Sequence, residues 1–201
     1  MKNAPPRRGR PGYDLESLLT VAARLFNERG YDGTSMEDLS RKLGITKSAI
    51  YHHVPSKQEL LRLAVDRALD GLFAEVEKLD AVEGRAVDRL EHLVRGSVTV
   101  LVDRLPFVTL LLRVHGNTKV ERDALARRRE FDHIVGELVT KAAAEGDLRP
   151  DVDPATAARL LFGMINSLIE WYRPRGGVGP EELADAVVAV AFDGLRIREK
   201  D

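Results

Sequence analysis

The fold of this chain is indicated most directly by residues 34–60, which read TSMEDLSRKLGITKSAIYHHVPSKQEL. The first part predicts a short helix over residues 35–42, because Leu39 and Leu43 recur at the four-residue spacing of one buried helix face. Gly44 follows directly and is expected to end this helix, since glycine adopts the left-handed backbone conformation without a clash from a Cβ atom.

The second part predicts another short helix over residues 47–53, directly after the turn. Thr46 is placed to cap its first backbone N–H groups. Pro55 ends it, because the residue before a proline is driven out of helical geometry. Ser56 is then placed to cap a third helix. Two short helices joined by a tight turn form the helix-turn-helix layout.

The second of these helices is expected to carry base-reading side chains near its N-terminal end. We expect Ala49 and Ile50 to face the core. That leaves an outer face formed by Lys47, Ser48, Tyr51 and His52. An ammonium group, a hydroxyl and two aromatic rings with polar tips suit contacts with phosphates and base edges.

Residues 22–61 together resemble the DNA-binding domain of the TetR family of bacterial transcriptional regulators. The resemblance rests on Ala23, Leu25, Phe26, Gly30, Tyr31, Thr34, Leu39, Gly44, Ile45, Ser48, Tyr51, His52, Ser56, Lys57, Leu60 and Leu61. One departure is Val54, where the family usually has an aromatic residue. The expected DNA-binding residues are Thr34, Ser35, Thr46, Lys47, Ser48, Tyr51, His52 and Lys57, with Thr34, Ser35 and Lys57 on phosphates.

Composition limits the class of protein. The chain has 201 residues, of which 44% are hydrophobic and 31% charged, and it contains no cysteine. No apolar run reaches the roughly 20 residues of a membrane span, and the basic N-terminus lacks the apolar segment of a signal peptide. Net charge is −1, but residues 1–60 carry +3 and the remainder −4. We therefore expect a cytoplasmic protein with a basic head and an acidic body, and no membrane partner.

Outside the first stretch, apolar residues recur at three- and four-residue spacing, which predicts helices. The expected helices cover residues 14–30, 57–79, 86–104, 107–116, 118–146, 155–173 and 181–198. The apolar run at 107–116 is short enough for a strand, and its helical neighbours decide in favour of a helix. The sequence thus predicts an all-α fold with about nine helices.

This pattern divides the chain into three parts. Residues 1–12 form a basic arm, either a solvated disordered tail or a segment that lies along DNA. Residues 13–58 form a three-helix helix-turn-helix DNA-binding domain, and residues 59–201 form a six-helix ligand-binding and dimerisation domain.

The last two expected helices are apolar around much of their circumference, which suits either a central core helix or a subunit interface. The resemblance implies the second, with two helices from each subunit forming a four-helix bundle. The expected interface residues are Leu160, Leu161, Met164, Ile165, Leu168, Val187 and Ala191. A homodimer also places two recognition helices on two half-sites, roughly 34–36 Å apart, of a palindromic double-stranded DNA operator.

The resemblance further implies an effector pocket in the body. Candidate ligand-binding residues are the polar or amphipathic side chains within apolar segments: Thr99, Arg113, His115, Arg128, Asn166 and Trp171. Each also has a structural explanation, such as an arginine whose stem covers apolar surface. Residues 171–184 are similar to a segment of TetR relatives that respond to acyl-CoA thioesters. An acyl-CoA-like effector and an uncharged apolar compound are both compatible with the sequence.

Catalysis is not expected. The chain shows no Gly-rich nucleotide loop, no nucleophile with a general base, and no metal-ligand spacing, since neighbouring His52 and His53 point about 100° apart on a helix. We expect no catalytic residue, cofactor or metal. The sequence favours a ligand-responsive repressor, with a DNA-anchored protein-interaction module as the alternative and activation also open.

Overall fold

The computed structural model describes residues 14–174 and 176–195, and this part of the chain is helical throughout its regular structure. Nine α-helices are present in these residues: α1 (Leu15–Arg29), α2 (Met36–Leu43), α3 (Lys47–His53), α4 (Lys57–Glu77), α5 (Ala86–Asp103), α6 (Leu105–Arg113), α7 (Lys119–Ala144), α8 (Pro154–Trp171) and α9 (Pro180–Leu195). A 3-10 turn, Lys78–Ala81, follows α4. The predicted all-α class is confirmed. Residues 107–113 of the ambiguous run at 107–116 belong to α6, and residues 114–116 lie beyond its end.

Local sequence explains where the first helices begin and end. Ser35 and Asp38 form a reciprocal capping box at the start of α2, and Gly44 ends α2 in the left-handed conformation at φ 66°. Thr46 caps α3 by accepting a hydrogen bond from the backbone N–H of Ala49 at 3.2 Å. Val54, which departs from the family pattern, is fully buried and still packs in the core.

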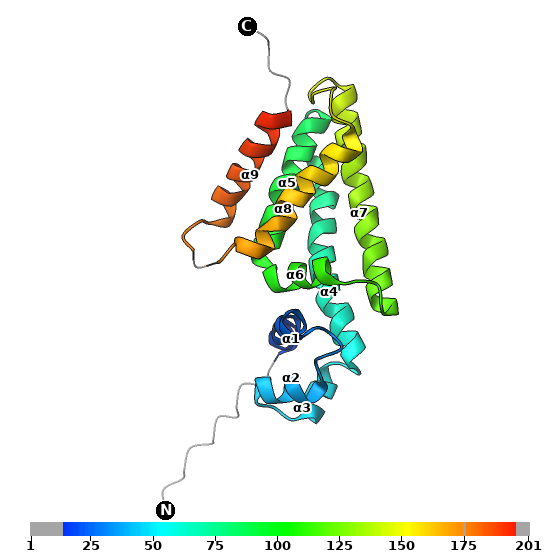
Figure 1. Ribbon diagram of the computed structural model, residues 1–201, viewed down its shortest axis with the longest axis vertical. Helices are drawn as coiled ribbons and strands as arrows, with labels where there is room; N and C mark the ends of the chain where they lie inside the picture. The colour runs from blue at the N-terminus through cyan, green and yellow to red at the C-terminus, as the bar shows by residue number, and fades with distance from the viewer. Residues whose placement is uncertain (1–13, 175, 196–201) are drawn as a thin grey trace, which may run out of the picture.

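Helix α4 joins the head to the body. Its 21 residues span about 30 Å at the ordinary helical rise. Its first half packs beside α1 in the head, and it continues upward against α5, α6 and α7, as Figure 1 shows. The head and body therefore share one continuous element.

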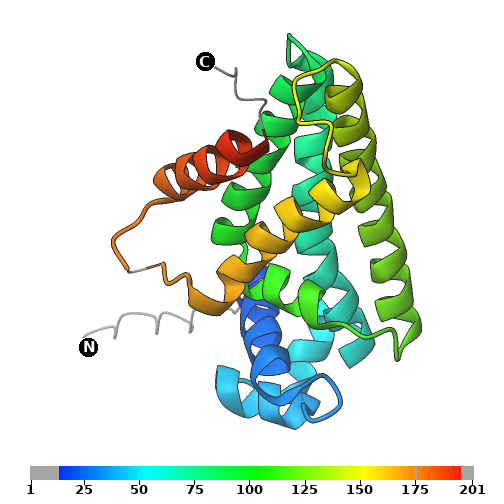
Figure 2. The same ribbon diagram turned by 45° about the horizontal axis from the view of Figure 1, so that its top comes forward.

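The body is a bundle around α5. Helix α9 packs chiefly on α5, whereas α8 packs on α7 and crosses in front of α5 (Figure 1 and Figure 2). Phe131 of α7 joins two neighbouring helices through edge-to-face ring contacts, at 6.2 Å from Phe73 and 5.4 Å from Phe162 between centroids. No helix within the described ranges is long and apolar enough to cross a membrane.

A short helix, α6, connects the body to the head. Asn27 Nδ2 of α1 donates a hydrogen bond to the carbonyl of Pro106 at 2.8 Å. At the other end of α6, the buried carboxylate of Glu121 accepts hydrogen bonds from the backbone N–H groups of residues 115, 116 and 117 at 2.9–3.1 Å. These bonds fix the turn between α6 and α7, because a buried amide without a partner is costly.

We predict that Glu121→Ala destabilises the fold by about 3 kcal/mol, since it leaves three backbone donors without their acceptor. Urea denaturation followed by circular dichroism measures this loss. Glu130→Ala is the matched control, because Glu130 is exposed on the same helix, and it should change stability by no more than about 0.5 kcal/mol. Equal losses in the two variants would contradict the role of Glu121.

Candidate functional site

The outer face of α3 is available to a partner. Lys47, Ser48 and His52 are exposed, and Tyr51 is 49% exposed, while Ile50 is fully buried on the opposite side. Because this exposed face combines an ammonium, a hydroxyl and two rings with polar tips on the second helix of a helix-turn-helix, it is the strongest candidate for base contacts. The roles of its residues in binding DNA stay predictions.

Lys47 has an acidic partner in the free protein. Its Nζ lies 2.9 Å from Glu37 Oε2, and both side chains are largely exposed. The hydrogen bond from Lys47 lowers the pKa of the Glu37 carboxyl, so Glu37 is ionised at neutral pH. A DNA phosphate or base must compete with this carboxylate for the Lys47 ammonium.

Ser35 and Thr46 lie at the exposed starts of α2 and α3 as helix caps. The Ser35 hydroxyl accepts from the backbone N–H of Asp38 and donates to the carboxylate of that residue at 2.6 Å. This hydroxyl is the largest cause that lowers the pKa of the Asp38 carboxyl. Both caps satisfy backbone N–H groups at the starts of exposed helices, and at α2 the carboxylate of Asp38 already accepts from the N–H of Ser35 at 3.0 Å.

Thr34 is buried in the head and Lys57 bonds within it, and their expected phosphate contacts stay predictions. Thr34 is 1% exposed, and its hydroxyl donates to the carbonyl of Gly30 at 2.8 Å. Lys57 Nζ donates to the carbonyls of Tyr31 and Thr34 at 2.9 Å each, and it lies 4.2 Å from the centroid of the Tyr31 ring. The polar atoms of both side chains are therefore engaged within the domain.

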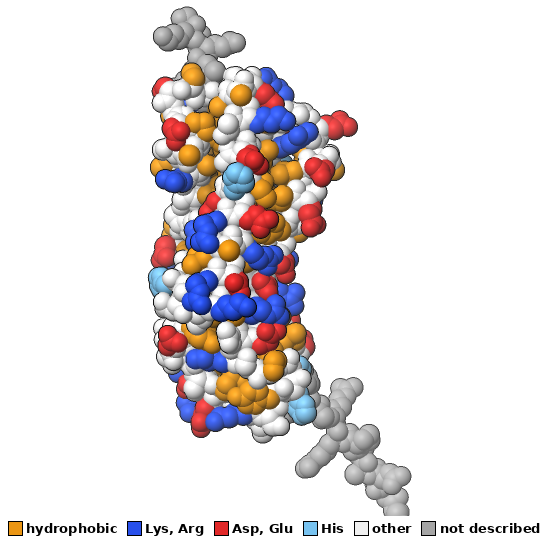
Figure 3. All heavy atoms as spheres, turned by 90° about the vertical axis from the view of Figure 1, so that its right-hand side faces the viewer, with side chains coloured by type: hydrophobic (Ala, Val, Ile, Leu, Met, Phe, Trp, Pro, Cys, Tyr) orange, Lys and Arg blue, Asp and Glu red, His pale blue; other side chains and the backbone are white. Residues whose placement is uncertain are grey.

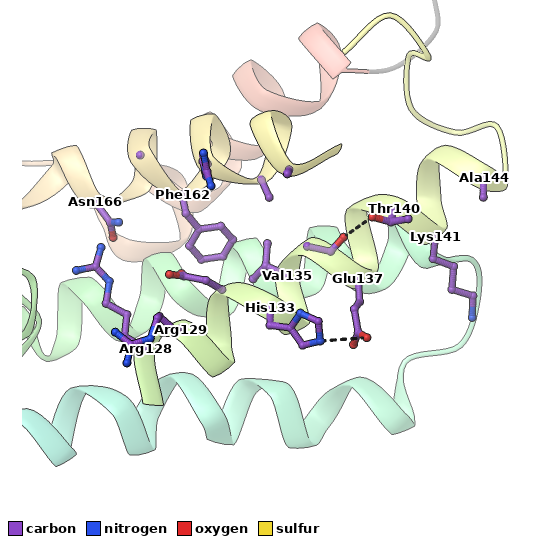
Figure 4. Close-up of a pocket in the computed structure, with 16 residues that line it drawn as sticks. Arg128, Arg129, His133, Val135, Glu137, Thr140, Lys141, Ala144, Phe162 and Asn166 are labelled. Atoms are coloured by element: carbon purple, nitrogen blue, oxygen red, sulfur yellow. Dashed lines mark hydrogen bonds and ion pairs between the residues drawn. The ribbon is translucent and has the colours of Figure 1, made fainter. Parts of the chain in front are cut away.

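A groove of about 870 Å³ runs between α7 and α8 in the body. Figure 4 shows Phe162 and Asn166 pointing from α8 toward α7. The basic residues that line the groove are Arg128, Arg129, His133, Lys141 and Arg159. Apolar surface from Val135, Ala158 and Phe162 adjoins them. On the face that carries α7, Lys and Arg side chains gather across the middle of the molecule, with acidic side chains beside them (Figure 3).

A smaller cavity of about 30 Å³ lies beneath the groove, where α4, α5, α6, α7 and α8 meet. Four residues line both spaces: Arg128, Asp132, Phe162 and Asn166. Burial raises the pKa of the Asp132 carboxyl, and the nearby Arg128 partly opposes this rise. The groove is thus wide and partly basic, and its deepest part is narrow and mostly apolar.

The structure brings together two of the six predicted ligand residues, Arg128 and Asn166. Arg113 and His115 line a separate hollow of about 420 Å³ between head and body. Thr99 donates its hydroxyl to the carbonyl of residue 95 at 3.1 Å, and Trp171 is 58% exposed. These last two line neither the groove nor the cavity, so the six residues do not form one site.

Sequence reasoning missed several groove residues. Asp132 and Phe162 lie on the shared boundary of groove and cavity, and Arg129 and Arg159 line the groove. A signal was available, because residues 128, 132, 136 and 140 recur at four-residue spacing on α7 and form one stripe. From sequence alone, such a stripe of polar and small residues could face either solvent or a neighbouring helix across a groove. The position of α8 decides between the two.

The predicted dimer residues need correction. Leu161, Ile165 and Leu168 are buried in the core of their own chain, because α8 packs this face on its neighbours. Val187 and Ala191 are buried likewise, because α9 packs on α5. These five side chains have almost no surface left for a partner.

Other apolar side chains on the same two helices are exposed instead. Leu160 is 67% exposed, Trp171 58% and Val190 69%. On α8, Leu160 and Trp171 share one face with the partly exposed Met164, since their spacing follows the helical repeat. We call Leu160, Met164, Trp171 and Val190 the α8–α9 apolar face. Of the seven predicted interface residues, only Leu160 and Met164 belong to it.

The chain matches known proteins along most of its length. The family model described as bacterial regulatory proteins, tetR family, matches residues 18–64. The model described as tetracyclin repressor-like, C-terminal domain, matches residues 83–195. The HTH-type transcriptional repressor KstR2 of Rhodococcus jostii is 28% identical over 193 residues, covering 93% of each chain.

Solved structures give the same result. A member of the TetR transcriptional regulator family from Streptomyces coelicolor A3 is 59% identical, with a TM-score of 0.83 and coverage of 91% of this chain and 92% of that one. The structure of AibR in complex with isovaleryl coenzyme A and operator DNA is 28% identical, with a TM-score of 0.73 and coverage of 88% and 97%.

The pair formed by Lys47 and Glu37 leads to two predictions of opposite sign. Lys47→Ala should weaken binding to a duplex selected from a random DNA library by roughly tenfold, and reduce the salt dependence by about one unit per subunit. Glu37→Gln should strengthen binding a few-fold, because it frees Lys47 and removes a negative charge. Fluorescence anisotropy over a salt series measures both effects.

Glu77→Gln is the control for the change in charge, because Glu77 is exposed at the far end of α4. It should leave DNA affinity unchanged. An affinity of the Lys47→Ala variant equal to that of the parent at every salt concentration would remove Lys47 from the interface.

Proposed function

Because the chain belongs to the TetR family of bacterial regulators, we propose that it is a ligand-responsive repressor that binds a palindromic operator as a homodimer and is released by a small-molecule effector. The family consists of DNA-binding transcriptional regulators and not of enzymes. A protein that acts on DNA in a bacterium works in the cytoplasm, so we propose that location.

The observation that carries the effector proposal is the groove between α7 and α8. Its volume of about 870 Å³ is within the range of small-molecule sites. Arg129, Lys141 and Arg159 offer positive charge along it, and Phe162 offers an apolar surface. We propose an acyl-CoA-like effector, whose phosphates suit the basic residues and whose acyl group suits the apolar part. AibR, at 28% identity, supports this class by its complex with isovaleryl coenzyme A.

These basic residues differ from those that the sequence first suggested. The segment at 171–184, which is similar to one in relatives that respond to acyl-CoA thioesters, contributes Arg173. Arg173 donates to the backbone carbonyls of Glu170 and Tyr172 within its own segment. The proposed phosphate contacts therefore lie on α7 and α8.

The alternative is a DNA-anchored protein-interaction module without an effector. A solid body with no void larger than a few waters would favour this alternative, and the cavity of about 30 Å³, which holds only one or two water-sized groups, taken alone does so. The adjoining groove supplies the remaining space and favours the effector. Partner proteins would have to recognise the same basic and apolar lining.

A thermal-shift screen of the purified protein tests the effector. Acyl-CoA thioesters at about a hundredfold their dissociation constant should stabilise the protein by roughly 2.7 kcal/mol, and should release it from selected DNA, whereas free fatty acids should do neither.

Arg159→Ala should weaken thioester binding about tenfold, because it removes a phosphate partner. Lys119→Ala, an exposed lysine on the same helix bundle outside the groove, is the control. A flat screen with intact DNA binding would favour the interaction module.

The α8–α9 apolar face is the proposed dimer interface, because exposed apolar residues on these two helices favour burial against a second copy. We predict that Leu160→Glu shifts the protein from dimer to monomer and weakens DNA binding more than tenfold. Light scattering after size-exclusion chromatography measures the mass. Ala126→Glu, at an exposed position on α7, should remain dimeric, and a dimeric Leu160→Glu variant would exclude this face.

A further inference from the structure

Ser97 carries a buried hydroxyl that the fold does not use. The residue is 2% exposed in the middle of α5, and its Oγ has no hydrogen-bond partner among residues 14–174 and 176–195. Thr99, Thr109, Thr140 and Ser167 behave differently, since each donates to a carbonyl three or four positions earlier in its own helix, at 2.7–3.1 Å. Such back-bonding is the ordinary arrangement for a helical hydroxyl.

The unpaired hydroxyl lies at the cavity beneath the groove. The cavity is lined mainly by apolar side chains, including Leu101, Leu111 and Phe131. Ser97 and Asn166 add one hydroxyl and one amide to this lining. Each group can donate and accept a hydrogen bond, so together they match either a carbonyl or a hydroxyl oxygen.

The size and charge of the cavity limit what can bind. A volume of about 30 Å³ holds one or two water-sized groups, which excludes a headgroup and admits a small substituent. Arg128 and Asp132 lie at its boundary with the groove, and the rest of its lining is apolar apart from Ser97 and Asn166. The cavity therefore suits a neutral oxygen, whereas an anion is better placed at the basic residues of the open groove.

We propose that Ser97 and Asn166 bind one neutral oxygen of the effector, so that the effector carries a carbonyl or hydroxyl group on the apolar portion that enters the cavity. This inference rests on the proposed function, because it assumes that the remainder of the ligand lies in the groove. An effector without this oxygen leaves the buried hydroxyl unpaired, and the site discriminates against it.

The test compares decanoyl-CoA with a set of oxo- and hydroxydecanoyl-CoA thioesters that differ in the position of the oxygen. Isothermal titration calorimetry on the full chain should show at least one oxygenated thioester binding about tenfold more tightly than decanoyl-CoA. Ser97→Ala should abolish this preference and leave the affinity for decanoyl-CoA within about twofold. Asn166→Ala should reduce the same preference, and Thr109→Val, which removes a hydroxyl bonded within its own helix, should retain it.

A second measurement needs no ligand. Ser97→Ala should raise the midpoint of thermal unfolding by about 2–4 °C, because it removes an unpaired buried hydroxyl. A lower midpoint would mean that the hydroxyl stabilises the fold, and would count against the inference. Wild-type protein that binds thioesters without preferring an oxygenated one overturns this inference alone. Wild-type protein that binds none of them overturns both this inference and the proposed effector class.

Discussion

One lysine side chain, that of Lys57, holds the start of α4 to the loop between α1 and α2. Lys57 bonds the carbonyls of Tyr31 and Thr34 and lies against the Tyr31 ring. These contacts hold the ammonium against the head. They give the carbonyl of Thr34 a donor and add a second donor to the carbonyl of Tyr31, which also accepts from the backbone N–H of Thr34. Because α4 continues unbroken into the body, the head and the body share the helix whose start this lysine anchors.

Helix α6 gives the body a second connection to the head. Its first turn accepts a hydrogen bond from Asn27 of α1, and its last residue, Arg113, donates to the carbonyl of the same Asn27 at 3.3 Å. The opposite side of α6 lines the internal cavity through Val108 and Leu111. The buried Glu121 then fixes the turn that follows α6. The cavity and the head are thus in contact with one short, well-anchored helix.

The sequence was sufficient for features decided within a few residues of the chain. The cap at Ser35 and the left-handed Gly44 bound α2 as expected, since a cap and a turn depend on local geometry. Thr34 and Lys57, both expected on phosphates, bond to the head itself. The partner of Thr34 is only four residues away, whereas those of Lys57 are 23 and 26 residues away and depend on packing that a local pattern does not give. Leu161 lies on α8, which has apolar residues on all sides. The sequence therefore does not show which side is buried, and the packing of α8 on α7 turns Leu161 inward.

The small volume of the cavity offers a way to couple effector binding in the body to the position of the head. A large preformed pocket would bind a ligand without changing its surroundings, and a ligand with equal affinity for two conformations shifts neither. Here the cavity of about 30 Å³ is bounded by α6 on one side and by Phe162 and Asn166 of α8 on another. A ligand group larger than this space requires the side chains or helices around it to move. We propose that movement of α6, which is bonded to Asn27 of α1, is how an effector in the body would change the position of the DNA-binding helices.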